Sequence, residues 1–180
     1  MSSGLEVLRI LLVDDNQHMR AIVSAILKGI GVRDVKECAD GAEALQAVRE
    51  WKPDIAIVDF QMAPLDGVEF TRLVRNSADS ENPYLPIIMM TGFAERARVV
   101  EARDSGVTEF LVKPVTARGV IDRINAVIFH PRPYVRTDSY FGPKRRGIDD
   151  TIPDPVAKAA TMRTPPVPEP AVAGPKFAQI

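Results

Sequence analysis

The sequence predicts an α/β domain built around a parallel β-sheet. Five apolar runs of strand length alternate with five segments in which apolar residues recur every three or four positions. Such alternation is typical of a parallel sheet, and near-continuous apolar strands fit a sheet that helices cover on both faces. The expected strands are Leu8–Val13, Val32–Cys38, Asp54–Asp59, Leu85–Thr91 and Glu109–Lys113.

The polarity of these runs predicts the order of the strands. The second run carries four charged residues, which suits an edge strand, whereas the first, third and fourth runs are the most apolar and belong in the centre. With right-handed crossovers, this pattern favours the order 2-1-3-4-5. The expected fold is therefore a flavodoxin-like, doubly wound, five-stranded parallel sheet with five helices.

Each predicted helix follows a strand. The first places Met19, Val23 and Leu27 on one face and meets glycines at its end, and the third has Phe70 and Leu73 among its apolar positions. The five helical segments are expected within residues 16–31, 40–53, 66–77, 93–106 and 116–129.

The chain divides into two parts of different composition. Residues 1–130 carry a charge balance of −4, whereas residues 131–180 carry +3 and hold ten of the 15 prolines. The second part shows no apolar run of strand length and no long helical face. We therefore expect one folded domain over 1–130 and a Pro-rich, basic and aromatic tail over 131–180 that is largely disordered.

One stretch of the tail, Tyr134–Arg146, mixes aromatic and basic side chains. Three aromatic residues within eight positions are costly to leave in water. We expect this stretch to contact the fifth-helix side of its own domain or a partner protein. A solvated linker and contact with nucleic acid are the remaining alternatives.

Composition limits the compartment and the partners. A single cysteine, Cys38, allows no internal disulfide and fits a reducing compartment. The N-terminus lacks the pattern of a secretory signal, and no apolar run approaches the roughly 20 residues of a membrane span. We expect a cytoplasmic protein without a membrane partner, and the net charge of −1 predicts no nucleic-acid partner.

Polar side chains stand at the carboxyl ends of four of the five strands, where ligands bind in parallel α/β sheets. They are Asp14, Asp15, Asp59, Thr91 and Lys113. Three converging carboxylates predict a divalent cation, and hard oxygen ligands favour Mg²⁺. A lysine and a hydroxyl beside them would bind an anionic group. Together these residues indicate a phosphoryl site with Asp59 as the nucleophile.

The stretches "LLVDDN", "IVDFQMAPLDG", "MMTG" and "EFLVKP" closely resemble the CheY-like receiver domain of bacterial response regulators, in the same order and at the same intervals. The resemblance covers Leu8 to Phe129. It implies that Asp59 is the phosphoacceptor and that Asp14 and Asp15 are the acidic metal pair. It also implies that the main-chain carbonyl of Gln61 completes a metal site to which Asp59 contributes.

The resemblance assigns roles on the last two strands as well. Thr91 is the hydroxyl that turns toward the phosphoryl group, and Lys113 pairs with it and precedes a cis peptide bond to Pro114. Phe110 takes the position of the family's aromatic switch, where tyrosine is commoner, and without a hydroxyl its ring lacks a hydrogen bond that would hold it outward. The alternative for Phe110 is a plain core aromatic.

By resemblance, the chain is a two-component response regulator. It would accept a phosphoryl group from a histidine kinase or a histidine phosphotransfer protein and catalyse only its own phosphorylation and dephosphorylation. Its output would be binding of an unknown downstream protein to the fourth helix, fifth strand and fifth helix. Two alternatives are a haloacid-dehalogenase-like phosphatase, which carries its nucleophile on the first strand, and a scaffold that is never phosphorylated.

Overall fold

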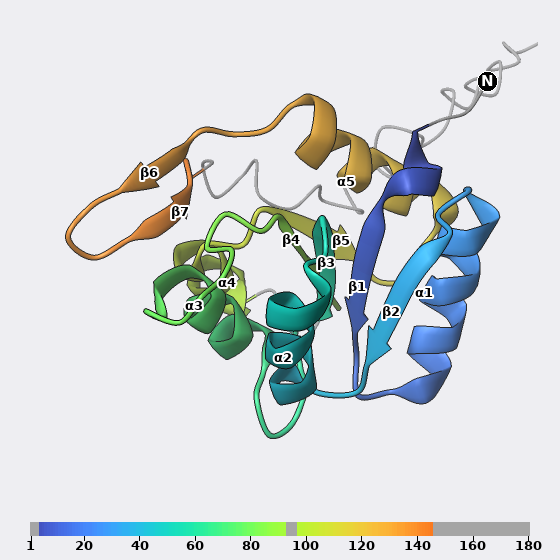
Figure 1. Cartoon of the computed structure of the whole chain (residues 1–180), viewed down its shortest axis with the longest axis horizontal. Coiled ribbons are helices and arrows are strands. Elements are labelled where there is room, and N and C mark those ends of the chain that lie inside the picture. The colour runs from blue at the N-terminus through green and yellow to red at the C-terminus, as the bar shows by residue number, and fades with distance from the viewer. Residues whose placement is uncertain (1–3, 93–96, 146–180) are drawn as a thin grey trace, which may run out of the picture.

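The structure is a computed structural model that describes residues 4–92 and 97–145. A five-stranded parallel sheet in the order β2-β1-β3-β4-β5 forms its centre (Figure 1). The predicted strand order is confirmed, and each strand lies within the predicted run. The strands are β1 (Arg9–Val13), β2 (Asp34–Cys38), β3 (Ile55–Asp59), β4 (Ile87–Thr91) and β5 (Glu109–Val112).

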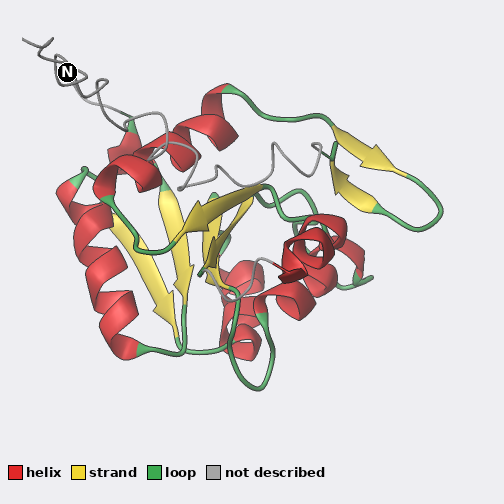
Figure 2. Ribbon diagram, turned by 180° about the vertical axis from the view of Figure 1, so that it is seen from behind, coloured by secondary structure: helices red, strands yellow, loops and turns green. Residues whose placement is uncertain are grey.

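Five helices cover the two faces of the sheet. Helices α1 and α5 pack on one face, and α2, α3 and α4 pack on the other (Figures 1 and 2). A short 3-10 turn, η1 (Leu5–Val7), precedes β1. The helices are α1 (Gln17–Gly29), α2 (Gly41–Trp51), α3 (Gly67–Asn76), α4 (Val99–Ser105) and α5 (Ala117–Phe129). Part of the segment predicted for the fourth helix lies outside the described residues.

Side-chain caps explain where four of the helices begin. An oxygen of the preceding polar residue accepts hydrogen bonds from main-chain N–H groups in the first turn, which otherwise lack partners inside the helix. Helix α4 instead has a clear end, at Gly106, whose φ of 103° favours glycine. The capping residues are Asn16, Asp40, Asp66 and Thr116.

Apolar side chains fill the space on both sides of the sheet. Leu12 and Ile57 point into the layer beneath α1 and α5, whereas Leu11 and Phe70 lie in the layer beneath α2 and α3. All four are fully buried, and burying a side chain of this size stabilises a fold by about 1.5–3 kcal/mol. None of the helices among residues 4–92 and 97–145 is long and apolar enough to span a membrane.

The region after α5 corrects the sequence-based expectation. No strand was predicted beyond His130, yet β6 (Tyr134–Arg136) and β7 (Phe141–Pro143) form an antiparallel hairpin. The hairpin packs near α3 of its own domain (Figure 1), whereas we expected contact with the fifth-helix side or with a partner protein. The isolated segment was too short and too rich in proline to reveal these strands. The rest of the predicted tail, residues 146–180, lies outside the described residues.

Candidate functional site

Parallel pairing brings the predicted site residues to one edge of the sheet. Asp14 follows β1, Asp59 and Thr91 end β3 and β4, and Lys113 follows β5. The N–H of Lys113 donates to the Thr91 carbonyl at 2.9 Å, which keeps these two residues side by side. The structure thus brings together residues that lie up to 99 positions apart in the sequence.

Three carboxylates meet at this edge. Each of Asp14, Asp15 and Asp59 offers an oxygen within 4.8 Å of the others, and Asp14 and Asp59 are buried whereas Asp15 is exposed. Gln61 lies two residues beyond Asp59 on the exposed loop between β3 and α3. Clustered carboxylates repel each other, so this arrangement favours a bound cation.

The Asp14 side chain is the part of the cluster best suited to a metal ion. One of its oxygens accepts a hydrogen bond from Asn16 N–H at 2.8 Å. The other, Oδ2, is buried and has no hydrogen-bond partner within the described part of the chain. Buried polar atoms normally have partners, and an all-oxygen donor set is what Mg²⁺ prefers. The residues present therefore fit a magnesium ion.

Lys113 contacts Asp59 directly. Its Nζ lies 2.6 Å from Asp59 Oδ1, and the peptide bond between Lys113 and Pro114 is cis. Burial raises the pKa of Asp59, the hydrogen bond from Lys113 lowers it in part, and the Asp14 charge raises it again. Burial also raises the pKa of Asp14, which the Asn16 N–H opposes. Asp59 is thus a largely buried carboxylate with the ammonium group of Lys113 beside it.

Thr91 and Phe110 lie behind the charged residues. The Thr91 hydroxyl is buried and donates to the Gly92 carbonyl at 3.3 Å. Phe110 is also buried and packs with Phe60 and Val99 in the small cluster beneath α4. In this structure Phe110 is a core aromatic, and its role as a switch stays a prediction.

Three neighbours of the site were not singled out from the sequence. Arg20 donates to the Asp14 carbonyl at 2.8 Å, and Arg98 pairs with Asp66 at 3.2 Å. Gly67 lies so close to the Asp59 carbonyl that a Cβ there would collide with it. Arg20 falls in the first turns of α1, a place that the sequence could have suggested. Arg98 is 32 residues from its partner, and no spacing pattern indicates that contact.

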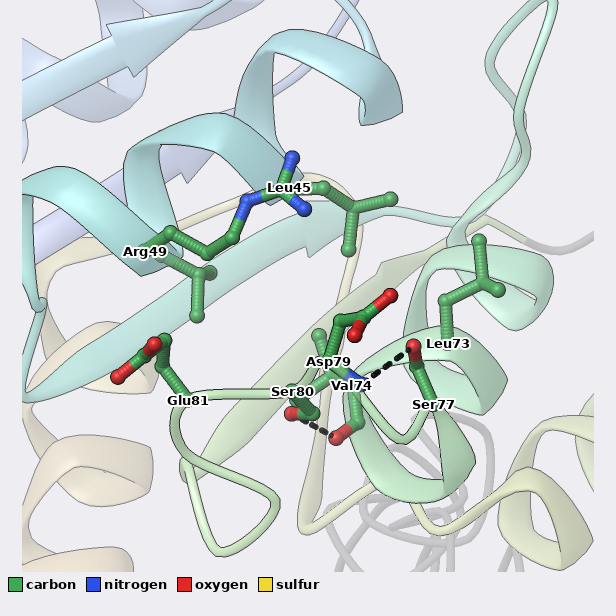
Figure 3. A pocket seen from close by; sticks show the side chains of 9 residues that line it. Leu45, Arg49, Leu73, Val74, Ser77, Asp79, Ser80 and Glu81 are labelled. Carbon is green, nitrogen blue, oxygen red and sulfur yellow. Dashed lines mark hydrogen bonds between the residues drawn. The ribbon is translucent and has the colours of Figure 1, made fainter.

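A groove between α2 and α3 lies away from the carboxylates (Figure 3). Its lining includes Leu45, Val48 and Leu73, as well as Val74 and Ser80, whose hydroxyl donates to the Val74 carbonyl at 2.6 Å. Its volume of about 70 Å³ is well below the roughly 300–1,000 Å³ of small-molecule sites. The carboxylate edge is therefore the better candidate for a functional site.

Known proteins share this architecture. The chain is 33% identical to the chemotaxis protein CheY of Pseudomonas aeruginosa over 120 residues, which cover 67% of this chain and 95% of the relative. It is 32% identical to the chemotaxis protein CheY-3 of Vibrio cholerae, over 67% of this chain and 91% of the relative.

Solved structures agree with these relatives. Chemotaxis protein CheY4 of Vibrio cholerae superposes with a TM-score of 0.60 at 30% identity, covering 67% of this chain and 98% of that one. The receiver domain of a sensor histidine kinase from Pseudomonas aeruginosa PAO1 gives a TM-score of 0.59 at 28% identity, over 66% of this chain and 94% of that one. That structure is described with a magnesium ion coordinated in its active-site cleft.

The profile of one protein family, the response regulator receiver domain, matches residues 10–125. This match contains four complete strands, β1 without its first residue and four complete helices, together with the carboxylates, Thr91 and Lys113. The matched range leaves the hairpin outside. The chain therefore belongs to the response regulator receiver family and is a two-component signalling protein.

Proposed function

We propose that Asp59 accepts a phosphoryl group from a histidine kinase or a histidine phosphotransfer protein, with Mg²⁺ bound beside it. One observation carries this proposal: Lys113 Nζ lies 2.6 Å from an oxygen of Asp59, a carboxylate that also has an oxygen within 4.8 Å of Asp14 and Asp15. These residues would catalyse only the phosphorylation and dephosphorylation of the protein itself.

The chain's own groups divide the chemistry between them. An Asp59 oxygen attacks phosphorus, the bond from phosphorus to the donor imidazole nitrogen breaks, and its electron pair stays on the imidazole. Lys113 exchanges its contact with the carboxylate for one with a phosphoryl oxygen, and the Thr91 hydroxyl donates to another. Later attack of water on phosphorus returns Asp59 and releases inorganic phosphate.

Asp14, Asp15, Asp59 and the main-chain carbonyl of Gln61 would hold the magnesium ion. When bound, Mg²⁺ neutralises negative charge on the incoming phosphoryl group. The buried Asp14 Oδ2 supports this assignment, because it otherwise lacks a partner among the described residues. Asp15 is exposed and would bind from the solvent side.

Output would follow from changed protein binding. Phosphorylation adds about −1.5 to −2 charges at Asp59 and draws Thr91 toward it. Phe110 would then repack, and the surface of α4, β5 and α5 would favour a different downstream protein. The compartment would be the cytoplasm, where such partners lie.

The direct test is labelling by acetyl phosphate in the presence of Mg²⁺. Asp59→Asn should abolish the labelling, because an amide oxygen is not a nucleophile, whereas the exposed control Asp122→Asn should label like the wild type. Intact-mass measurement reads out both variants. Labelling that persists in Asp59→Asn would place the acceptor elsewhere, and an unlabelled wild type would favour the scaffold alternative.

A further inference from the structure

The C-terminal hairpin contacts the end of the sheet at which β4 and β5 begin, and Asp59 lies at the opposite end of the strands. Tyr134 donates from its hydroxyl to the Tyr84 carbonyl at 2.9 Å, just before β4. Arg132 donates to the Thr108 carbonyl, just before β5, and Arg145 pairs with Asp104 on α4 at 3.3 Å. These contacts join the hairpin and its flanking residues to three separate segments of the receiver.

Two glycines face each other where the hairpin meets the end of α4. A Cβ at Gly142 would lie 3.0 Å from the Gly106 Cα and 2.7 Å from the Tyr140 hydroxyl oxygen. A Cβ at Gly106 would lie 3.1 Å from the Phe141 carbonyl. The main chain of β7 therefore packs directly against the residue that ends α4. Such a contact has no flexible side chain to absorb a shift of the helix.

A buried arginine connects the same elements. Arg75, on α3, donates to the Gly106 carbonyl at 3.0 Å, to the Pro83 carbonyl at 2.9 Å and to the Thr108 hydroxyl at 3.4 Å. The Tyr134 ring covers its guanidinium, with 5.4 Å between the Arg75 Cζ and the ring centre. The end of α4 is thus held on one side by Arg75 and on the other by β7.

The other face of α4 reaches the carboxylate site. Val99 and Ala102 pack with Phe60, the residue that follows Asp59, and with Phe110. Helix α4 has seven residues, so its contact with this cluster and its contact with β7 lie within two turns of each other. A displacement of α4 at one of these contacts would therefore change the geometry of the other.

We propose that the hairpin is a clamp on the C-terminal end of α4, whose hold is coupled to the phosphorylation of Asp59. This inference rests on the proposed function. Repacking of Thr91 and Phe110 moves α4. The main-chain contact between Gly106 and Gly142 cannot adjust to this movement, so phosphorylation loosens the hairpin. Linkage then requires that loosening the hairpin favours the phosphorylated conformation by the same factor.

Hydrogen exchange on the full chain tests the first half of the proposal. With acetyl phosphate and Mg²⁺, amides of residues 134–143 should exchange faster by on the order of 5- to 100-fold. Intact mass measured in parallel shows whether Asp59 carries phosphate. Unchanged or slower exchange in a labelled protein overturns the clamp, whereas absent labelling overturns the proposed phosphorylation instead.

Variants test the reverse direction with beryllofluoride and Mg²⁺ as the phosphoryl mimic. Gly142→Ala should loosen the hairpin and tighten beryllofluoride binding by a factor similar to the change in exchange. Gly29→Ala is the matched control, because a Cβ there meets nothing within 4 Å, and it should bind like the wild type. If Gly142→Ala does not fold, Arg145→Gln should give a smaller change of the same sign. Equal affinity in the folded variant and the wild type overturns the proposal.

Discussion

At the scale of the residue, Asp14 destabilises the metal-free fold and also belongs to the proposed metal site. Its Oδ2 is buried and unpaired within the described residues, and burial raises its pKa above 3.8. A raised carboxyl pKa means that the folded state holds its proton more tightly than the unfolded state does. The resulting stabilisation is present at low pH and is lost as the pH rises through the folded pKa.

Asp14→Asn should therefore raise the free energy of unfolding at pH 7 without divalent ions, by about 1 kcal/mol. Adding Mg²⁺ should stabilise the wild type and leave the variant nearly unchanged. Urea denaturation with and without Mg²⁺ measures both effects. Asp15→Asn is the comparison, because the exposed Asp15 should gain less in metal-free buffer. Unfolding of Asp14→Asn would contradict this interpretation and show that Asp14 is needed for the fold.

Cys38 allows a second prediction at this scale. Burial raises the pKa of its thiol to about 11, with a contribution from the Glu43 charge. Two units above the ordinary value of 9.0 reduce the thiolate fraction about 100-fold, so native protein at pH 8 should react with iodoacetamide about 100-fold more slowly than glutathione does. Stability should also fall as the pH rises from 9 to 11. A native rate equal to that of urea-unfolded protein would be inconsistent with this burial.

The strand-end argument located Asp14, Asp59 and Lys113 because parallel strands deliver their last residues to one edge. The same argument said nothing of Arg98, which reaches Asp66 and the Phe60 ring from the start of α4. Contacts between a helix and a distant loop depend on the packing of whole elements. They leave no spacing pattern in the sequence.

At the scale of the element, α3 shows what sequence periodicity misses. Apolar spacing picked out Phe70 and Leu73 among the recurring apolar positions of this helix, yet Leu73 is 41% exposed and Arg75 is 2% exposed. The hairpin accounts for the burial of Arg75, because the Tyr134 ring covers its guanidinium group. The apolar spacing therefore identified the side of α3 that faces the sheet, which includes Phe70, and missed the side that the hairpin covers.

The start of α3 carries a capping box. Asp66 accepts from the Glu69 N–H at 2.9 Å, and Glu69 accepts from the Asp66 N–H at 3.0 Å. Asp66→Ala should destabilise the domain by about 1–2 kcal/mol, because it removes the cap together with the Arg98 pair. Asp122→Ala, which breaks an exposed pair on α5, should cost less than about 0.5 kcal/mol. Thermal denaturation distinguishes the two, and equal losses would argue against the cap.

At the scale of the whole molecule, the folded unit extends beyond the family's matched range. The sheet and the site were predictable because alternation and strand ends are local signals. The hairpin was not, because its strands have three residues each and depend on Tyr84 and Thr108, which lie about 25 to 50 positions earlier. Tertiary contacts with the receiver add to the pairing of these two short strands.

A chain that ends at His130 should consequently be less stable than one that ends at Arg145. The loss should be at least about 2 kcal/mol, since Tyr140 and Phe141 are nearly buried and Arg75 would lose its cover. Urea denaturation of the two truncated chains, beside the full chain, measures the difference. Equal midpoints in all three would mean that the hairpin contributes no stability.

The hairpin also gathers every tyrosine of the chain. Tyr134 and Tyr140 belong to it, and Tyr84 lies beneath it with its ring 5.1 Å from that of Tyr134. The single tryptophan, Trp51, is on α2 beside Arg9. Near-ultraviolet signals of tyrosine therefore arise from one interface and those of tryptophan from another. The tyrosines therefore report on the C-terminal hairpin without any added label, and Trp51 reports on a different part of the fold.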